Sequence, residues 1–418
     1  MSSSEYRLHT LSNGLRVAYL KTPSALLAHC GFVIHAGSRN DGKNPGIAHC
    51  LEHMLFKGTN SRKTIHVLNH LEVVGGELNA FTTKEITSIY ATVQKKHFKR
   101  AADILFDITF NSNFPENELI KEKKVIKDEI NMYLDTPEEN IYDEFQEKIY
   151  NSHPLAHNIL GTSESVDQIT RQDIVEFVNT HYQYNNLVFV VVGNIPFEKV
   201  LQIAENLSFK YNNNNLTDSQ SFPDHSNQIF EYVPFRDVKK SDFGQSYGII
   251  GLPTLNESHS HKFPLLLLNN LLGGPGMNSR LSLAIREKYG YTYHIESGYQ
   301  AFRDSGLFHC YLSCEEKYLK RSIDLIEKEL TKLKTTKLGR VQLSQAKNQF
   351  IGQLTIANES KSGLMLHLGK GIVKSGKANS IKETIEHISK ITAENLLETA
   401  NLVFDLESFS HLYYVPDK

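Results

Sequence analysis

The chain has 418 residues, and its 45 basic side chains nearly balance 47 acidic ones. This length exceeds what a single hydrophobic core usually fills, so we expect two domains. The near-zero net charge lacks the basic footprint of a nucleic-acid-binding protein, and no apolar run is long enough to span a bilayer. We therefore expect neither nucleic acid nor a membrane as a partner.

The start of the chain and its cysteines indicate one compartment. Residues 1–7 contain no apolar segment of the kind found in secretory signals. The four cysteines show no secreted disulfide framework, and the spacing of Cys310 and Cys314 is not that of a zinc knuckle. We interpret this pair as buried or half-buried thiols and expect a reduced, cytoplasmic protein.

The first predicted helix runs from Asn44 to Gly58. Asn44 suits an N-cap, Pro45 suits the first helical position, and Gly58 suits a stop. An α-helix here has an apolar face and a polar face. The apolar face holds Ile47, Leu51, Met54 and Leu55. The opposite face holds His49, Glu52, His53 and Phe56.

His49, Glu52 and His53 have the spacing H-x-x-E-H, the inverted form of a zinc-protease motif. Two imidazoles one helical turn apart, with a carboxylate between them, suit the binding of zinc and the activation of its water. The alternative is a hydrogen-bonded histidine pair on a polar helix face. Two further histidine pairs have no glutamate between them, and we interpret them as structural or surface pairs: His66/His70 and His153/His157.

A catalytic zinc needs a third protein ligand, and a second predicted helix offers candidates. This helix begins at Pro115, and one stripe of it places Glu122 and Glu129 among the apolar residues Leu119, Ile126 and Tyr133. A carboxylate is unfavourable in such a place unless it meets a cation. A charged, solvated helix is an equally good interpretation from the residues alone.

Composition then divides the chain. Residues 186–194 form a continuous β-rich run, which predicts a strand buried on both faces. A polar stretch without apolar periodicity predicts a linker at about residues 211–225. The strand-like run Ile229–Val233 starts a second succession of strands and helices. We predict an N-terminal catalytic domain over residues 1–215 and a C-terminal domain over residues 225–418.

The zinc-type motif together with Glu129 resembles the pitrilysin family of inverted zinc metallopeptidases. Within that family the chain is most similar to the mitochondrial-processing-peptidase-like branch of roughly four-hundred-residue chains. The likeness extends over essentially the whole chain. It is carried by residues 11–17, 37–41, 52–59, 76–90 and by the glycine-rich loop at 272–281.

The resemblance implies a fold and an activity. The implied fold is α+β, with two similar domains that each pack helices on one side of a largely antiparallel sheet. The implied activity is zinc-dependent endopeptidase action on peptides or unfolded segments bound in extended conformation. One zinc per chain would be held by His49, His53 and Glu129, with Glu52 as the general base.

Further residue roles rest on the same resemblance. Glu122 matches an auxiliary acidic residue of the catalytic site, with a physical role in orienting a ligand histidine. A strand that includes Asn79, Ala80 and Phe81 matches the edge that binds an extended peptide. In the C-terminal domain, Arg286 matches an anchor for a substrate carbonyl, and Tyr293 matches a hydroxyl that stabilises the oxyanion.

Some alternatives stay open. The chain is expected to form a homodimer that encloses a chamber, and a heterodimer with a related chain is the other possibility. A dedicated precursor-maturation protease and a non-catalytic scaffold of the same fold are the competing functions. Two departures from the family pattern are Cys50, in place of a larger apolar residue, and Pro275, inside the glycine-rich loop.

Overall fold

The computed structural model describes residues 6–211 and 230–417, and these divide into two compact units. Of the described residues, the first unit contains 6–131, 157–211 and 356–382, and the second contains 132–156, 230–355 and 383–417. Each unit therefore takes a segment from the other half of the sequence. The linker predicted at about 211–225 lies almost wholly outside the described residues, with only Tyr211 inside them.

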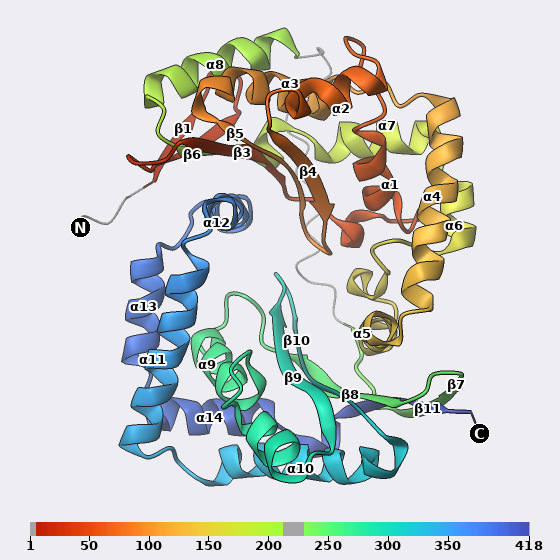
Figure 1. Cartoon of the computed structure of the whole chain (residues 1–418), viewed down its shortest axis with the longest axis vertical. Helices are drawn as coiled ribbons and strands as arrows, with labels where there is room; N and C mark the ends of the chain where they lie inside the picture. Colours follow the sequence, from red (N-terminus) through yellow and green to blue (C-terminus); the bar gives the residue numbers. More distant parts are fainter. Residues whose placement is uncertain (1–5, 212–229, 418) are drawn as a thin grey trace. The chain divides into compact units, whose positions relative to one another are not determined.

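The first unit is built on a six-stranded sheet in the order β1-β2-β6-β3-β5-β4 (Figure 1). Its strands are β1 (Arg7–Thr10), β2 (Arg16–Lys21), β3 (Leu27–Ile34), β4 (Glu77–Thr82), β5 (Thr87–Gln94) and β6 (Leu187–Gly193). Its helices are α1 (Ile47–Met54), α2 (Thr64–Glu72), α3 (Phe98–Phe110), α4 (Glu116–Leu134), α6 (Ser163–Gln168), α7 (Arg171–His181), α8 (Phe197–Lys210) and α12 (Lys361–Ser375). All strand pairings are antiparallel except β2 with β6.

Strand β6 confirms the prediction of a strand buried on both faces, because each of its seven residues is buried. Phe189 packs with Phe32 of β3 and Phe106 of α3 on one face. Val188 and Val190, which alternate with Phe189, belong to the cluster formed with α12 on the other face. A helix from the second half of the sequence thus covers the sheet face opposite α3 and α8 (Figure 1).

The second unit has a five-stranded sheet in the order β7-β11-β8-β10-β9. Its strands are β7 (Arg236–Ser241), β8 (Ser246–Thr254), β9 (Thr292–Ala301), β10 (Gly306–Cys314) and β11 (Ser410–Pro416). Its helices are α5 (Pro137–Tyr150), α9 (Lys262–Gly273), α10 (Glu316–Thr335), α11 (Arg340–Ala357), α13 (Ile381–Lys390) and α14 (Ala393–Val403), with the short segment η5 (Ser282–Glu287).

The α+β fold class is confirmed, and one detail differs from the expectation of helices on a single side. In the second unit, Ile250 and Cys310 pack in the core with α9, α10 and α14. Their strand neighbours Ile249 and Tyr311 pack with Ile141 of α5 instead. The second face of each sheet is thus also apolar, and one helix from the other half of the sequence covers it.

The strand predicted over Ile229–Val233 is wrong for the residues that the structure describes. Residues 230–235 have no strand, Ile229 lies outside the described residues, and β7 begins at Arg236. Pro234 has no N–H to donate to a ladder, which accounts for the later start. Among the described residues, no helix combines the length and apolar character that crossing a bilayer requires.

Candidate active site

Three possible metal ligands of the first unit lie close together: His49 and His53 of α1, and Glu129 of α4. One ligand atom from each lies within 4.8 Å of the others, and no second group of this kind occurs in the described part of the chain. Oε2 of Glu129 is 3.8 Å from Nε2 of His49 and 3.5 Å from Nε2 of His53. Ligands placed about 2.1 Å from a tetrahedral zinc are about 3.4 Å apart, so the donors and their spacing fit zinc.

The charge states of His49 and Glu129 suit a cation. Burial, and then the neighbouring His53, lowers the pKa of His49 to about 4, so its imidazole is neutral at pH 7. The hydrogen bond from His53 lowers the pKa of Glu129, which keeps its carboxylate ionised. A neutral imidazole and an ionised carboxylate are the forms in which these groups bind metals. Burial acts to lower the pKa of His53, but hydrogen bonds with Glu129 and Glu122 outweigh it and raise this pKa, so the imidazole would release its proton on binding a metal.

Helix α1 is shorter than predicted and is capped differently. It covers Ile47–Met54 with Gly46 at the N-cap, so neither Asn44 as N-cap nor Gly58 as the stop is correct. Gly46 has φ of 92°, and a Cβ there would lie 2.5 Å from the carbonyl oxygen of Leu160. The cap is the buried carboxylate of Asp41, which accepts the N–H groups of Gly46 at 2.6 Å and Ala48 at 3.1 Å. An acid here also complements the positive end of the helix.

The faces of α1 are those expected from the sequence. The apolar side chains Ile47, Leu51, Met54 and Leu55 are buried. Cys50 is also fully buried, so the smaller residue at this position sits inside the packed core. Glu52 and His53 are half-buried and His49 is buried, while both histidines point Nε2 at Glu129. The helix packs through one face and presents its polar groups on the other.

Glu122 contacts the Nδ1 side of the His53 ring, away from Glu129. Its Oε2 is 3.1 Å from Nδ1 of His53, and its Oε1 is 2.6 Å from Nζ of Lys57. A carboxylate on Nδ1 fixes the ring so that Nε2 is available to a metal. Glu122 therefore acts through His53, as a positioning residue. The sequence did not predict this role for Lys57, which lies in the loop after α1.

Glu52 is held by the edge strand of the sheet. Its Oε2 accepts a hydrogen bond of 2.6 Å from the hydroxyl of Thr82, the last residue of β4. Burial raises the pKa of Glu52, and the Thr82 hydrogen bond acts in the opposite direction. The sequence did not predict Thr82 as a partner of Glu52. It ties the carboxylate to the end of a strand.

Strand β4 has one free edge within the described sheet, because its only ladder partner is β5. Asn79 is exposed, and Ala80 and Phe81 are half-buried. The backbone of an edge strand offers unpaired N–H and C=O groups to an added strand. The structure thus places the three predicted peptide-binding residues on an edge that ends beside Glu52.

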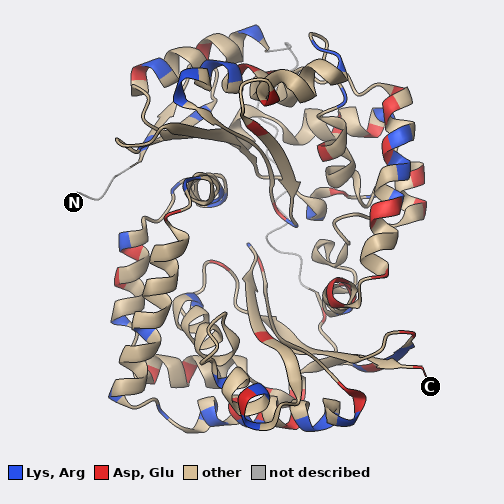
Figure 2. Cartoon of the chain, in the orientation of Figure 1, with Lys and Arg blue, Asp and Glu red and all other residues tan. Residues whose placement is uncertain are grey.

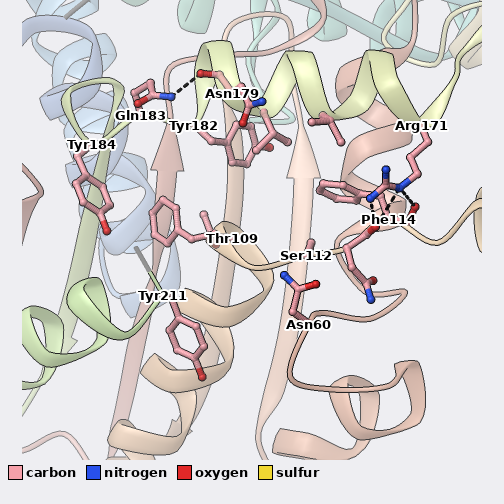
Figure 3. Close-up of a pocket in the computed structure, with 14 residues that line it drawn as sticks. Asn60, Thr109, Ser112, Phe114, Arg171, Asn179, Tyr182, Gln183, Tyr184 and Tyr211 are labelled. Atoms are coloured by element: carbon pink, nitrogen blue, oxygen red, sulfur yellow. Dashed lines mark hydrogen bonds between the residues drawn. The ribbon is translucent and has the colours of Figure 1, made fainter. Parts of the chain in front are cut away.

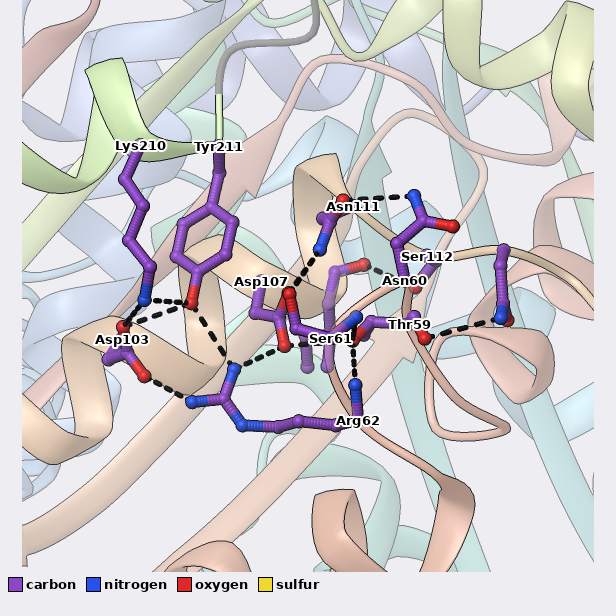
Figure 4. A network of polar contacts seen from close by, with 12 residues as sticks. Thr59, Asn60, Ser61, Arg62, Asp103, Asp107, Asn111, Ser112, Lys210 and Tyr211 are labelled. Carbon is purple, nitrogen blue, oxygen red and sulfur yellow. Dashed lines mark hydrogen bonds and ion pairs between the residues drawn. The ribbon is translucent and has the colours of Figure 1, made fainter.

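Half-buried Arg62 fastens the loop after α1 through ion pairs (Figure 4). Arg62 pairs with Asp103 and Asp107 of α3, and the Thr59 hydroxyl donates to Asp107 at 2.9 Å. Asp103 also accepts from the hydroxyl of Tyr211 at 3.0 Å. The loop that carries the chain away from His53 and Lys57 is therefore anchored to α3.

A polar pocket of about 270 Å³ in the first unit includes none of the three candidate ligands among its lining residues (Figure 3). Arg171, at the start of α7, donates to the carbonyl groups of Asn113 and Phe114. Phe114 has φ of 46°, a left-handed conformation that is uncommon for a bulky residue. Arg171 thus fixes the turn from which α4, the helix of Glu122 and Glu129, begins. Along α4 itself acidic and basic residues are interspersed (Figure 2).

Arg286 and Tyr293 belong to the second unit. Arg286 lies in the π-helical segment η5 and donates to Glu287 at 2.9 Å. It lines a pocket together with the glycine-rich loop, where Pro275 follows the end of α9. Tyr293, on β9, is 91% exposed. Substrate-binding roles for these two residues stay predictions.

The fold and the ligand cluster define a class of protein, the α+β proteins with a histidine–histidine–glutamate cluster that could hold a metal ion. Residues 16–163 match the family model described as insulinase (peptidase family M16), and residues 168–350 match the one described as the peptidase M16 inactive domain. The chain belongs to peptidase family M16, which confirms the resemblance to pitrilysin-type peptidases. All three candidate ligands fall within residues 16–163.

Relatives cover nearly the full chain. An uncharacterized zinc protease of Rickettsia felis is 32% identical, covering 96% of this chain and 95% of its own. The uncharacterized zinc protease YmxG of Bacillus subtilis is 30% identical, with 95% of each chain covered. A Helicobacter pylori protease superimposes with a TM-score of 0.90 at 21% identity, over 99% of this chain and 100% of that one. The two relatives support a zinc protease at the level of the family, and the structural match supports the fold.

Proposed function

We propose that this chain is a zinc-dependent endopeptidase with one zinc per chain, held by His49, His53 and Glu129. The observation that carries the proposal is the convergence of these side chains next to Glu52, at the end of a free strand edge. When bound, zinc would supply a Lewis acid for the scissile carbonyl and lower the pKa of a water molecule.

Glu52 is proposed as the general base. Its Oε2 accepts a hydrogen bond from the hydroxyl of Thr82, which fixes the carboxylate. The carboxylate takes a proton from the attacking water and passes it to the nitrogen of the leaving amine. Burial raises the pKa of this carboxylate and so strengthens it as a base. Because water is the nucleophile, no acyl-enzyme forms.

An extended peptide is the substrate that suits β4. Main-chain hydrogen bonds to the free edge give affinity without demanding a sequence, and neighbouring pockets set preference. Asn79, Ala80 and Phe81 would form this platform. In the second unit, we propose that Arg286 donates to a substrate carbonyl and that the Tyr293 hydroxyl stabilises the developing oxyanion.

The proposal also covers the cellular compartment and the oligomeric state of the protein. The four cysteines are free and buried, which supports a reducing compartment such as the cytoplasm. A homodimer is proposed because two chains of this length can enclose a chamber that admits peptides and unfolded segments. Sedimentation of a fully active monomer would contradict the dimer and leave the zinc site untouched.

The test combines metal analysis with one substitution. Purified protein is expected to contain about one zinc per chain and to cleave a quenched fluorescent peptide. Glu52→Gln is expected to keep the zinc and to lose about 10²–10⁴-fold in kcat/KM. Protein that binds no zinc, or a Glu52→Gln variant that cleaves at the wild-type rate, would overturn the proposal. A zinc-binding but inactive wild-type protein would instead favour a scaffold.

A further inference from the structure

Helix α12 brings a lysine to the substrate edge of the first unit. Lys370 lies over the ring of Phe81 on β4, with Nζ 5.6 Å from the ring centroid. The helix is pressed onto the sheet at the preceding residue, because a Cβ on Gly369 would lie 2.3 Å from Cγ2 of Val33. Its buried residues Met365 and Ile372 fix its rotation on the sheet. The position of Lys370 is therefore set by the core.

The neighbouring Lys374 forms an ion pair with a carboxylate, whereas Lys370 forms none among the described residues. Lys374, one helical turn further on, pairs with Glu85, and the other oxygen of Glu85 pairs with Arg39 at 2.5 Å. Burial, and then the charge of Lys374, lowers the pKa of Lys370. A carboxylate beside Lys370 would oppose both effects, because an opposite charge favours the charged ammonium.

The pleat of β4 decides which substrate side chains meet Lys370. Thr82 points to Glu52, so the adjacent Phe81 points to the opposite face, where Lys370 lies. A strand added to the free edge would run about 4.8 Å from β4, and every second side chain of it would lie on the Phe81 face. The side chain opposite Phe81 would then be within reach of the flexible Lys370 ammonium.

We propose that Lys370 and Phe81 form a subsite for an acidic side chain, aspartate or glutamate, of a peptide added to β4. The inference rests on the proposed function for its location and adds a substrate preference to it. Phe81 packs against the methylene groups of the acidic residue, and Lys370 binds its carboxylate. The preferred substrates are therefore extended peptides with an acidic residue at one position near the scissile bond.

The experiment uses one quenched fluorescent peptide in which aspartate, asparagine or lysine is moved one position at a time across the cleavage region. The ratio of kcat/KM for aspartate over asparagine is measured for the full-length protein and its variants. At one position the wild type is expected to prefer aspartate about fivefold. Lys370→Gln should abolish this ratio, and Lys370→Glu should invert it in favour of lysine. Lys377→Glu makes the same charge change at an exposed lysine after α12 and should keep the wild-type ratio.

A binding arm separates this inference from the proposed function. The same peptides are titrated into the Glu52→Gln protein, and binding is followed by fluorescence anisotropy. Peptides that bind the Glu52→Gln protein with an aspartate preference but are not cleaved by the wild type would support the subsite and contradict the peptidase proposal. Cleavage or binding whose aspartate ratio is the same in the wild type and in Lys370→Glu would overturn the subsite. Failure of every peptide to bind would overturn it as well.

Discussion

Lys57 provides a test of how the metal ligands are positioned. Replacing it with methionine removes the cation 2.6 Å from Glu122, whose side chain is 8% exposed, and leaves His53 as the remaining partner of that carboxylate among the described residues. A hydrogen bond to a charged group contributes about 1.5–3 kcal/mol, and part of this loss reaches His53 through Glu122. If about 1 kcal/mol of this lost interaction energy weakens zinc binding by His53, the Kd for zinc rises about fivefold. Glu122→Gln, which touches the ligand directly, should weaken zinc binding about 10–100-fold.

The assay is competition for zinc with a fluorescent chelator at pH 7.5. Lys57→Arg should bind zinc nearly as well as the wild type, since a cation is kept beside Glu122. Lys121→Met is the matched control, because Lys121 lies next to Glu122 in sequence but has a 65% exposed side chain paired with Glu118. A Kd for Lys57→Met within twofold of that for Lys121→Met would refute the reasoning. So would a Lys57→Arg protein that binds zinc as weakly as Lys57→Met.

Three further predictions concern the framework of the two units. Asp41→Ala removes both acceptors at the start of α1 and should lower the free energy of unfolding by about 2 kcal/mol in urea denaturation. Asp41→Asn should lower it less. An Asp41→Ala protein as stable as the wild type would contradict the capping role. Gly369→Ala should lower the free energy of unfolding by about 1–3 kcal/mol, because its new Cβ would collide with Val33. Gly352→Ala in α11, where space is open, should leave the free energy of unfolding unchanged or raise it. The reverse order of stabilities would be inconsistent with the packing. Burial lowers the pKa of His309 to about 4, below its unfolded value of about 6.5. The unfolded state therefore binds more protons between these values, so this contribution to stability is complete above about pH 6.5 and is lost as the pH falls towards 4. His309→Asn should lose less stability between pH 7.5 and pH 5 than the wild type, and an unchanged loss would count against it.

Local patterns predicted the two faces of α1 better than its ends. Helical periodicity was enough to place His49 and His53 opposite a buried apolar face. The start of the helix was wrong because its cap is made by Asp41, outside the helix, across a glycine at positive φ. A capping rule that considers only the residue next to the helix misses such a carboxylate. The register of a helix is encoded locally, whereas its cap here depends on a loop.

Contacts between distant segments were the part that the sequence could not supply by itself. The residues alone left Glu129 undecided between a ligand and a solvated acid, and its choice rested on the family resemblance. Lys57 and Thr82 act through partners on α4 and α1, which no local spacing reveals. The placement of α12 on the first sheet depends on Gly369 fitting against Val33, a contact between residues far apart in the chain. The sequence could not predict the contact of Lys370 with Phe81 for the same reason.

Zinc K-edge X-ray absorption of the zinc-loaded protein reports the atoms that bind the metal. We expect two imidazole nitrogens at about 2.0–2.1 Å and carboxylate or water oxygen at about 2.0–2.2 Å. His49→Ala should remove one imidazole from the spectrum, and His66→Ala, in the separate pair on α2, should leave it unchanged. Sulfur scattering at about 2.3 Å, or a spectrum that His49→Ala does not alter, would contradict the assignment of the site to His49, His53 and Glu129.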